Sequence, residues 1–130
     1  MKPVQREEIL DYVTYGEKRN EIQLSVLKQK EPRRIHLGEY LTFLFENTET
    51  IRYQIQEMMR VEQIVKEEAI QHEIKTYNEL IGEEGELGCV LLIEIADAQI
   101  RPQKLREWLG LQEKIYLVLD SGERVYAEWD

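Results

Sequence analysis

Two glutamates occupy positions where an amphipathic helix should be apolar. If residues 48–64 form a helix, Glu62 falls within the apolar stripe that contains Ile55. In a second helix that follows, Glu73 falls within the arc that contains Tyr77. A carboxylate that is removed from water requires a cation, a hydrogen-bond donor or a proton. The pair therefore has two interpretations, a site that binds a cation or shuttles a proton, and a structural network that holds the helices together.

Other polar side chains of the same segment could complete such a network. Arg52 or Arg60 could pair with the carboxylates, and the amides of Gln54 and Gln56 could hydrogen-bond without the desolvation cost of a charge. Neutral amides at this density are typical of contacts between helices or between subunits. We predict a candidate buried polar network with these members: Glu62, Glu73, Arg52, Gln54, Tyr77 and Asn78.

A weaker metal-binding candidate lies in the same segment. Glu68 and His72 stand at positions i and i+4 of the second helix and could share a metal ion. On a helical wheel, however, His72 points away from Ile70 and Ile74, which favours an exposed histidine. A di-iron bundle would need two Glu-x-x-His pairs and two further carboxylates, and the sequence contains neither pair. We expect no metal and no other cofactor.

Length and composition predict one soluble domain in a reducing compartment. The chain has 130 residues, the size of one ordinary domain. Cys89 is its only cysteine, which excludes an internal disulfide and a Cys-x-x-Cys metal site. The opening MKPVQREEIL is charged where a signal peptide needs an apolar run, and no segment has the roughly 20 apolar residues of a membrane span. We expect a cytoplasmic protein that does not bind membranes.

The negative charge lies entirely in the second half of the sequence. Residues 1–66 contain 11 basic and 11 acidic residues, whereas residues 67–130 contain 6 and 15 and so carry the whole net charge of −9. Such a surface repels a phosphate backbone. We therefore expect no nucleic-acid partner and favour a protein partner.

The pattern of the sequence predicts an α+β fold. The Thr14–Glu17 spacing is that of a capping box, and Pro32 should end the helix that follows it. The run LGCVLLIEI is apolar without alternation, which predicts a central strand covered on both faces, with Cys89 as a small buried apolar side chain. We expect an antiparallel or mixed sheet of about five strands, with an N-terminal helix and a central helical pair packed on it. The expected elements are helices 15–30, 48–64, 67–81 and 102–109, and strands 33–37, 40–46, 87–95, 114–119 and 124–129.

A family resemblance rests on the central block. The segment FENTETIRYQIQEMMRVEQIVKEEAIQHEIKTYNELI, the opening MKPVQREEIL and the glycine-bounded strand resemble an uncharacterised bacterial family that is defined only as a domain of unknown function. The resemblance covers nearly the whole chain. Members tend to be encoded beside rubrerythrin-like and iron–sulfur oxidoreductase-like proteins, so the resemblance implies a redox or peroxide-stress context. It supplies no catalytic residues.

Two hypotheses of function follow. The first is a non-catalytic accessory or interaction module of a cytoplasmic redox system, whose partners are redox proteins. The alternative is a small metal-binding protein or enzyme that uses carboxylates of the central helix pair. We also expect a homo-oligomer, because the last strand ends in an aromatic residue, Trp129, that needs an apolar neighbour.

Overall fold

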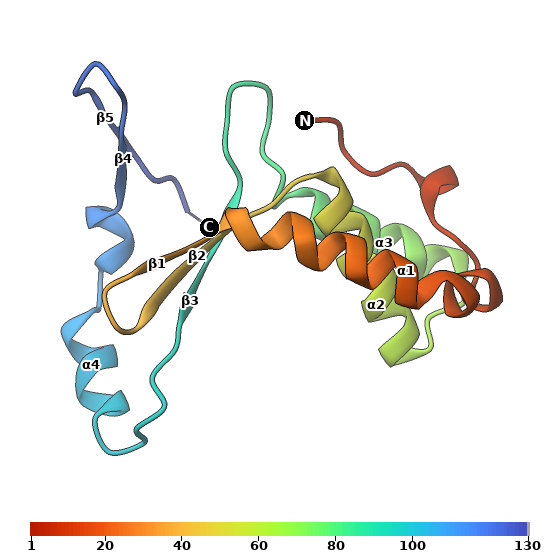
Figure 1. The fold of residues 1–130 in the computed structure, drawn as a ribbon, viewed down its shortest axis with the longest axis horizontal. Coiled ribbons are helices and arrows are strands. Elements are labelled where there is room, and N and C mark those ends of the chain that lie inside the picture. Colours follow the sequence, from red (N-terminus) through yellow and green to blue (C-terminus); the bar gives the residue numbers. More distant parts are fainter. Residues whose placement is uncertain (130) are drawn as a thin grey trace. The chain divides into compact units, whose positions relative to one another are not determined.

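The computed structural model describes residues 1–129, which divide into two compact units between Glu94 and Ile95. Helices and antiparallel strands are both present, so the predicted α+β class is confirmed (Figure 1). The five strands form one sheet of three and one of two strands, where a single sheet had been expected. The single domain predicted from chain length stays a prediction, because compact units of one chain can fold together. None of the described helices is long and apolar enough to cross a bilayer.

The N-terminal helix begins earlier than its sequence pattern predicts. Helix α1 spans Tyr12–Lys30, and Asp11 is its N-cap residue. One carboxylate oxygen of Asp11 accepts the backbone N–H of Thr14 at 2.8 Å, and the other accepts the Thr14 hydroxyl at 2.7 Å. These two hydrogen bonds lower the pKa of Asp11 below its ordinary value. The predicted capping box is therefore wrong, because the charged acceptor three residues upstream caps the helix first.

A helix pair forms the apolar centre of the first unit. Helix α2 spans Thr48–Glu62, and its predicted cap is confirmed, since the Asn47 side chain accepts the backbone N–H of Thr50. Helix α3 spans Glu67–Asn78. A short 3-10 turn, η1 (Arg6–Glu8), lies in the N-terminal segment. The core contains Val4, Ile9, Ile51, Ile55, Met59, Ile70, Ile74 and Ile81.

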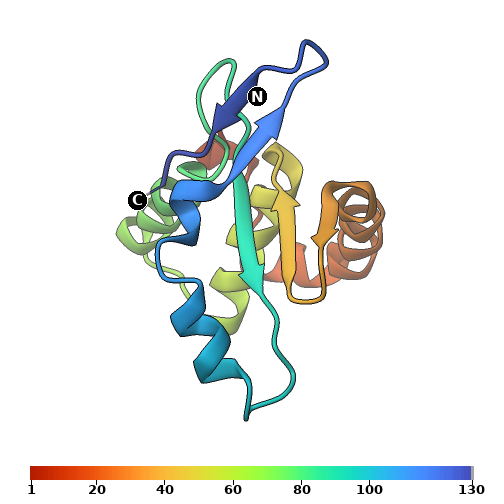
Figure 2. The same cartoon turned by 90° about the vertical axis from the view of Figure 1, so that its left-hand side faces the viewer.

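The sheet of the first unit has three antiparallel strands in the order β1-β2-β3. They are β1 (Arg34–Leu37), β2 (Leu41–Phe45) and β3 (Cys89–Ile93), preceded by the short turn η2 (Glu31–Arg33). Figure 2 shows β3 at one edge of this sheet. The prediction that this apolar run is the central strand is therefore wrong, because β2 lies in the middle. Cys89 is exposed, where a buried side chain was expected.

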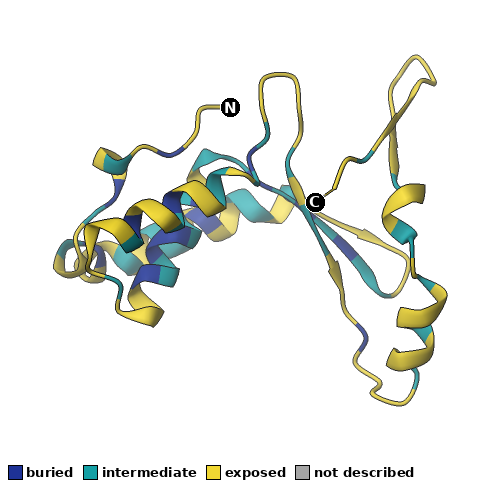
Figure 3. Cartoon of the chain, turned by 180° about the vertical axis from the view of Figure 1, so that it is seen from behind, coloured by how far each residue is buried: buried dark blue, intermediate teal, exposed yellow. Residues whose placement is uncertain are grey.

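The second unit contains little buried apolar surface. It consists of α4 (Arg101–Glu107), the 3-10 turn η3 (Leu111–Lys114) and a hairpin of β4 (Tyr116–Val118) and β5 (Arg124–Tyr126). Every residue of both strands is exposed (Figure 3). The rings of Tyr116 and Tyr126 contact each other at 5.3 Å between centroids. Trp129 lies outside the last strand and is also exposed, so the expected oligomer stays a prediction.

The start of α1 gives a direct test of its cap. Replacement Asp11→Ala removes both acceptors of Thr14 and should lower the free energy of unfolding, measured by urea denaturation. Replacement Glu17→Ala, at the residue that the sequence pattern assigns to a capping box, is the matched control and should have little effect. A larger loss for the control would show that the helix starts at Thr14.

Candidate functional site

The structure does not bring the two predicted glutamates together in a buried site. Glu62 is the last residue of α2 and is exposed, because Gln63 adopts the left-handed conformation and ends the helix there. Glu73 is half-buried on α3. Among the described residues, neither carboxylate has a hydrogen bond or an ion pair. The prediction that Glu62 is buried is wrong, because the helix does not continue past it.

The other predicted network residues have different roles. Arg52 pairs with Glu8 at 3.5 Å, and not with either predicted glutamate. Gln54 is half-buried without a hydrogen bond to any described residue, and Tyr77 packs against the apolar core. Glu68 and His72 are exposed on α3, and the described residues contain no group of three acidic, histidine or cysteine side chains placed to hold a metal ion.

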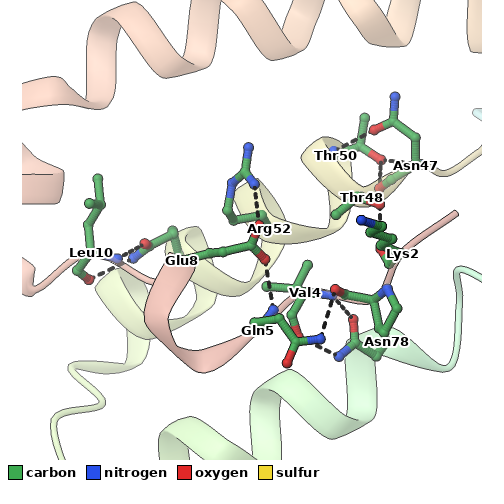
Figure 4. A network of polar contacts seen from close by, with 12 residues as sticks. Lys2, Val4, Gln5, Glu8, Leu10, Asn47, Thr48, Thr50, Arg52 and Asn78 are labelled. Atoms are coloured by element: carbon green, nitrogen blue, oxygen red, sulfur yellow. Dashed lines mark hydrogen bonds and ion pairs between the residues drawn. The ribbon is translucent and has the colours of Figure 1, made fainter.

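Asn78, the sixth predicted residue, holds the N-terminal segment in place. Its side-chain oxygen accepts the backbone N–H of Val4 at 2.8 Å, and its nitrogen donates to the carbonyl of Val4 at 3.0 Å (Figure 4). Gln56 binds Leu10 in the same way, at 2.6 Å to the N–H and 3.2 Å to the carbonyl. Each amide thus satisfies both backbone groups of one residue, as a neighbouring β-strand would. We call these two contacts the amide clamps.

Further contacts attach the N-terminal segment, residues 2–10, to the helix pair. The Thr48 hydroxyl donates to the carbonyl of Lys2. The guanidinium of Arg6 forms a two-point ion pair with Glu67, with distances of 2.8 and 3.0 Å. The side chain of Val4, at the first clamp, and that of Ile9, next to the second, are buried in the core. The segment is therefore an integral part of the first unit.

A carboxylate that the pattern did not single out lies at the contact between α1 and α2. Glu57 accepts the Tyr15 hydroxyl at 2.6 Å and the Arg19 guanidinium at 2.7 and 2.9 Å. Arg19 and Tyr15 hold the pKa of Glu57 below its ordinary value. Burial and the adjacent carboxylate raise the pKa of Tyr15, which stays a neutral phenol. One feature of the sequence could have indicated this contact: Tyr15 and Arg19 stand at positions i and i+4 of one helix and so share a face.

An open cleft of about 260 Å³ lies beside this contact. Buried Tyr15 and Gln56 form part of its wall, and half-buried Tyr53 and Arg52 form another part. The Tyr53 hydroxyl accepts a hydrogen bond from Gln23 at 3.1 Å. Most of these polar groups are already paired within the chain, so we assign the cleft to the contact between the helices.

The three-stranded sheet presents one face without a charged side chain. Residues directly opposite each other in antiparallel strands share a face, so Ile35, Phe43 and Leu91 lie on the same side. Successive side chains of a strand point to opposite faces of the sheet, so the other face carries Arg34, His36 and Thr42. We call the uncharged side the apolar sheet face. Its members are Ile35, Leu37, Leu41, Phe43, Phe45, Cys89, Leu91 and Ile93.

This face is only partly covered. Ile35 is 51% exposed, Leu37 58% and Ile93 40%. Cys89 lies at its border, and partial desolvation raises the pKa of its thiol, which stays protonated at neutral pH. The sequence pattern did not reveal the face, because β3 is apolar at every position and only its register with β2 assigns the sides.

Removing the Glu57 charge should reveal its structural role. At neutral pH, Glu57→Gln should lower the free energy of unfolding by about 2 kcal/mol, because two charge-assisted contacts are lost. A carboxylate with a lowered folded-state pKa stabilises the protein above its unfolded pKa, and this contribution disappears as the pH falls from about 4.5 through the folded value. The variant should therefore lose less stability than the parent between pH 5 and pH 3, measured by urea denaturation across that range.

Glu62→Gln is the matched control for that experiment, because Glu62 is exposed and unpaired among the described residues. Its unfolding curve should follow the parent. Equal losses for both variants would contradict the structural role assigned to Glu57 at the contact between α1 and α2.

The amide clamp at Asn78 can be tested by hydrogen exchange. Asn78→Ala removes the acceptor of the Val4 N–H, so exchange of the Val4 amide should accelerate roughly tenfold, equivalent to about 1.4 kcal/mol. The Leu10 amide keeps its bond to Gln56 and should change less. Asn20→Ala on the exposed side of α1 is the control. Unchanged exchange at Val4 would show that the clamp does not hold the segment.

Comparison with known proteins supports the family resemblance. No curated protein matches the chain significantly. A similar solved structure is the crystal structure of a novel protein of unknown function from Burkholderia pseudomallei K96243, with 32% sequence identity and a TM-score of 0.90. The match covers 96% of this chain and 71% of that one. A family model described as protein of unknown function (DUF3501) matches residues 3–130, and the chain therefore belongs to this family.

Proposed function

We propose that the protein is a non-catalytic accessory or interaction module of a cytoplasmic redox or peroxide-stress system. The observation that carries this proposal is the apolar sheet face, whose eight side chains are uncharged and whose outer members remain exposed. Exposed apolar surface is costly in water, and contiguous patches of it are typical of protein interaction sites.

Charge supports a protein partner of particular chemistry. Residues 67–130 carry the whole net charge of −9, and several of the acidic residues follow α3 in the sequence before β3 begins. A partner with an apolar patch and basic residues around it would satisfy both the apolar sheet face and this negative charge. Its association rate should decrease with added salt, because exposed charges are screened over about 8 Å at physiological ionic strength.

The redox part of the proposal rests on the family resemblance. It implies this context because members of the family tend to be encoded beside rubrerythrin-like and iron–sulfur oxidoreductase-like proteins. Proteins of these kinds are therefore the partners to test first. The alternative, a metal-binding protein or enzyme that uses helix-pair carboxylates, would require Glu62 and Glu73 to converge. The exposed position of Glu62 at the end of α2 gives that alternative no support.

A charge placed on the apolar sheet face should abolish partner binding. The tagged protein is used to capture proteins from its native host at low salt, and captured proteins are identified by mass spectrometry. Leu37→Lys should lose a redox protein that the parent retains, because burying an unpaired ammonium opposes the contact. Val61→Lys is the matched control, since Val61 is an apolar residue that is 72% exposed on α2, and it should retain the protein.

Thermal unfolding of both variants should resemble that of the parent, because both side chains are exposed. Equal capture by Leu37→Lys and the parent would overturn the assignment of the apolar sheet face. If the parent captures no redox protein, the proposed redox context is contradicted.

A further inference from the structure

We propose that two copies of the chain pair through their β3 edges, antiparallel, about a two-fold axis that passes beside Leu91. This inference goes beyond the proposed function, because it concerns self-association through a strand edge and not the binding of another protein. It also places the contact between the copies at β3, whereas the sequence pattern favours the last strand for this contact.

The hydrogen bonds at the two ends of β3 show which of its backbone groups are free. The N–H of Glu46 donates to Gly88 at 3.1 Å, and the N–H of Glu94 donates to Tyr40 at 2.7 Å. In an antiparallel pair, bonded positions alternate with non-bonded ones. Val90 and Leu92 therefore direct their N–H and C=O groups towards β2. The three remaining residues direct theirs towards the open edge, namely Cys89, Leu91 and Ile93.

The strand itself carries none of the sequence features that usually protect an edge strand. The run Cys89–Ile93 contains no charged residue and no proline, and its pairing with β2 is continuous without a bulge. The same alternation on the other edge leaves Arg34 and His36 of β1 with outward backbone groups, so that edge strand carries a charged residue. Charged side chains on an edge strand oppose further pairing. β3 is thus the edge that is competent to add a strand.

A second copy of the chain fits this edge without a charge conflict. Two-fold pairing beside Leu91 places Cys89 opposite Ile93 of the second copy, and every outward donor then meets an outward acceptor. In the same register, Glu94 lies opposite Gly88 of the second copy and not opposite another carboxylate. Like charges do not face each other, although the chain as a whole is acidic.

The pairing has a structural consequence. The two three-stranded sheets become one antiparallel sheet of six strands, and the side chains of Cys89, Leu91 and Ile93 keep their positions on the apolar side. The apolar sheet faces of the two copies then form one continuous surface. A dimer therefore offers a partner protein a surface twice as wide as a single chain does.

A cysteine introduced at position 93 tests the register with the native thiol. Residues opposite each other in a bonded antiparallel pair have Cα atoms about 5.5 Å apart, within the range of a disulfide. In the full chain, Ile93→Cys should therefore give a disulfide-linked dimer through Cys89 under mild oxidation, seen on a non-reducing gel and located by peptide mass spectrometry. Within one chain the two positions are about 13 Å apart along the strand, too far for a disulfide.

Leu92→Cys is the control for this experiment, because its side chain lies on the opposite side of the sheet, and it should not form the link. The double variant Cys89→Ala/Ile93→Cys should also lose it. Absence of the link in Ile93→Cys, or a link that persists in the double variant, would overturn the proposed register.

A proline tests the edge independently. Leu91→Pro removes an N–H that points away from β2, so the sheet of the single chain should survive while the dimer dissociates. Light scattering should give twice 15.6 kDa for the parent and 15.6 kDa for this variant. His36→Pro makes the same change on the β1 edge, and Leu91→Ala shortens the side chain but keeps the N–H. Both controls should remain dimeric.

A monomeric parent, or a Leu91→Pro variant that folds and remains dimeric, would overturn the proposal. If Leu91→Pro does not fold, the disulfide experiment still decides the register. Failure of this proposal is distinguishable from failure of the proposed function, because Leu37→Lys changes β1 and leaves the β3 edge intact.

Discussion

Apolar packing of α2 against α3 is the contact on which the rest of the first unit depends. Ile51 and Ile55 from α2 and Ile70 and Ile74 from α3 are almost completely buried in one cluster. Full burial of each such side chain stabilises the folded state by roughly 1.5–3 kcal/mol. Without this cluster the N-terminal segment would have no apolar surface to cover, and Val4 and Ile9 would be exposed.

The polar contacts depend on that packing and also make it specific. The N-terminal segment has only the short turn η1 as regular structure, so its other backbone groups need partners where it crosses the apolar surface. A buried unpaired N–H or C=O group is costly. Asn78 and Gln56 do this at two points with neutral amides, which carry no charge to desolvate. Glu57 joins α1 to α2 with a charge, and both of its partners come from α1. No described buried side-chain polar atom lacks a hydrogen bond.

The exposed apolar residues contrast with this well-satisfied core. The apolar sheet face and the hairpin of the second unit both leave large apolar side chains in contact with water. An isolated two-stranded hairpin is at best marginally stable. Such surfaces are consistent with a protein that works by contact with other chains, and a strand edge without charges provides one defined way to make such a contact.

The sequence by itself determined the local features of this protein. The start of α2 at Asn47, the end of α1 before Pro32 and the α+β class were all predictable, because caps, helix breakers and hydrophobic periodicity act over a few neighbouring residues. Tertiary structure decided which polar groups were buried. The carboxylate at the helix contact is Glu57 and not Glu62, because Glu57 meets Tyr15 and Arg19 of α1, whereas α2 ends at Glu62.

Long-range pairing is the reason why the remaining features could not be predicted. Asn78 binds a residue 74 positions away, and the position of β3 at the sheet edge follows from its pairing with β2. A uniformly apolar strand fits either the middle or the edge of a sheet, and its sequence contains no alternation that would assign its two sides. Only the register between strands distant in sequence determined that its apolar residues join Ile35 and Phe43 on one open face.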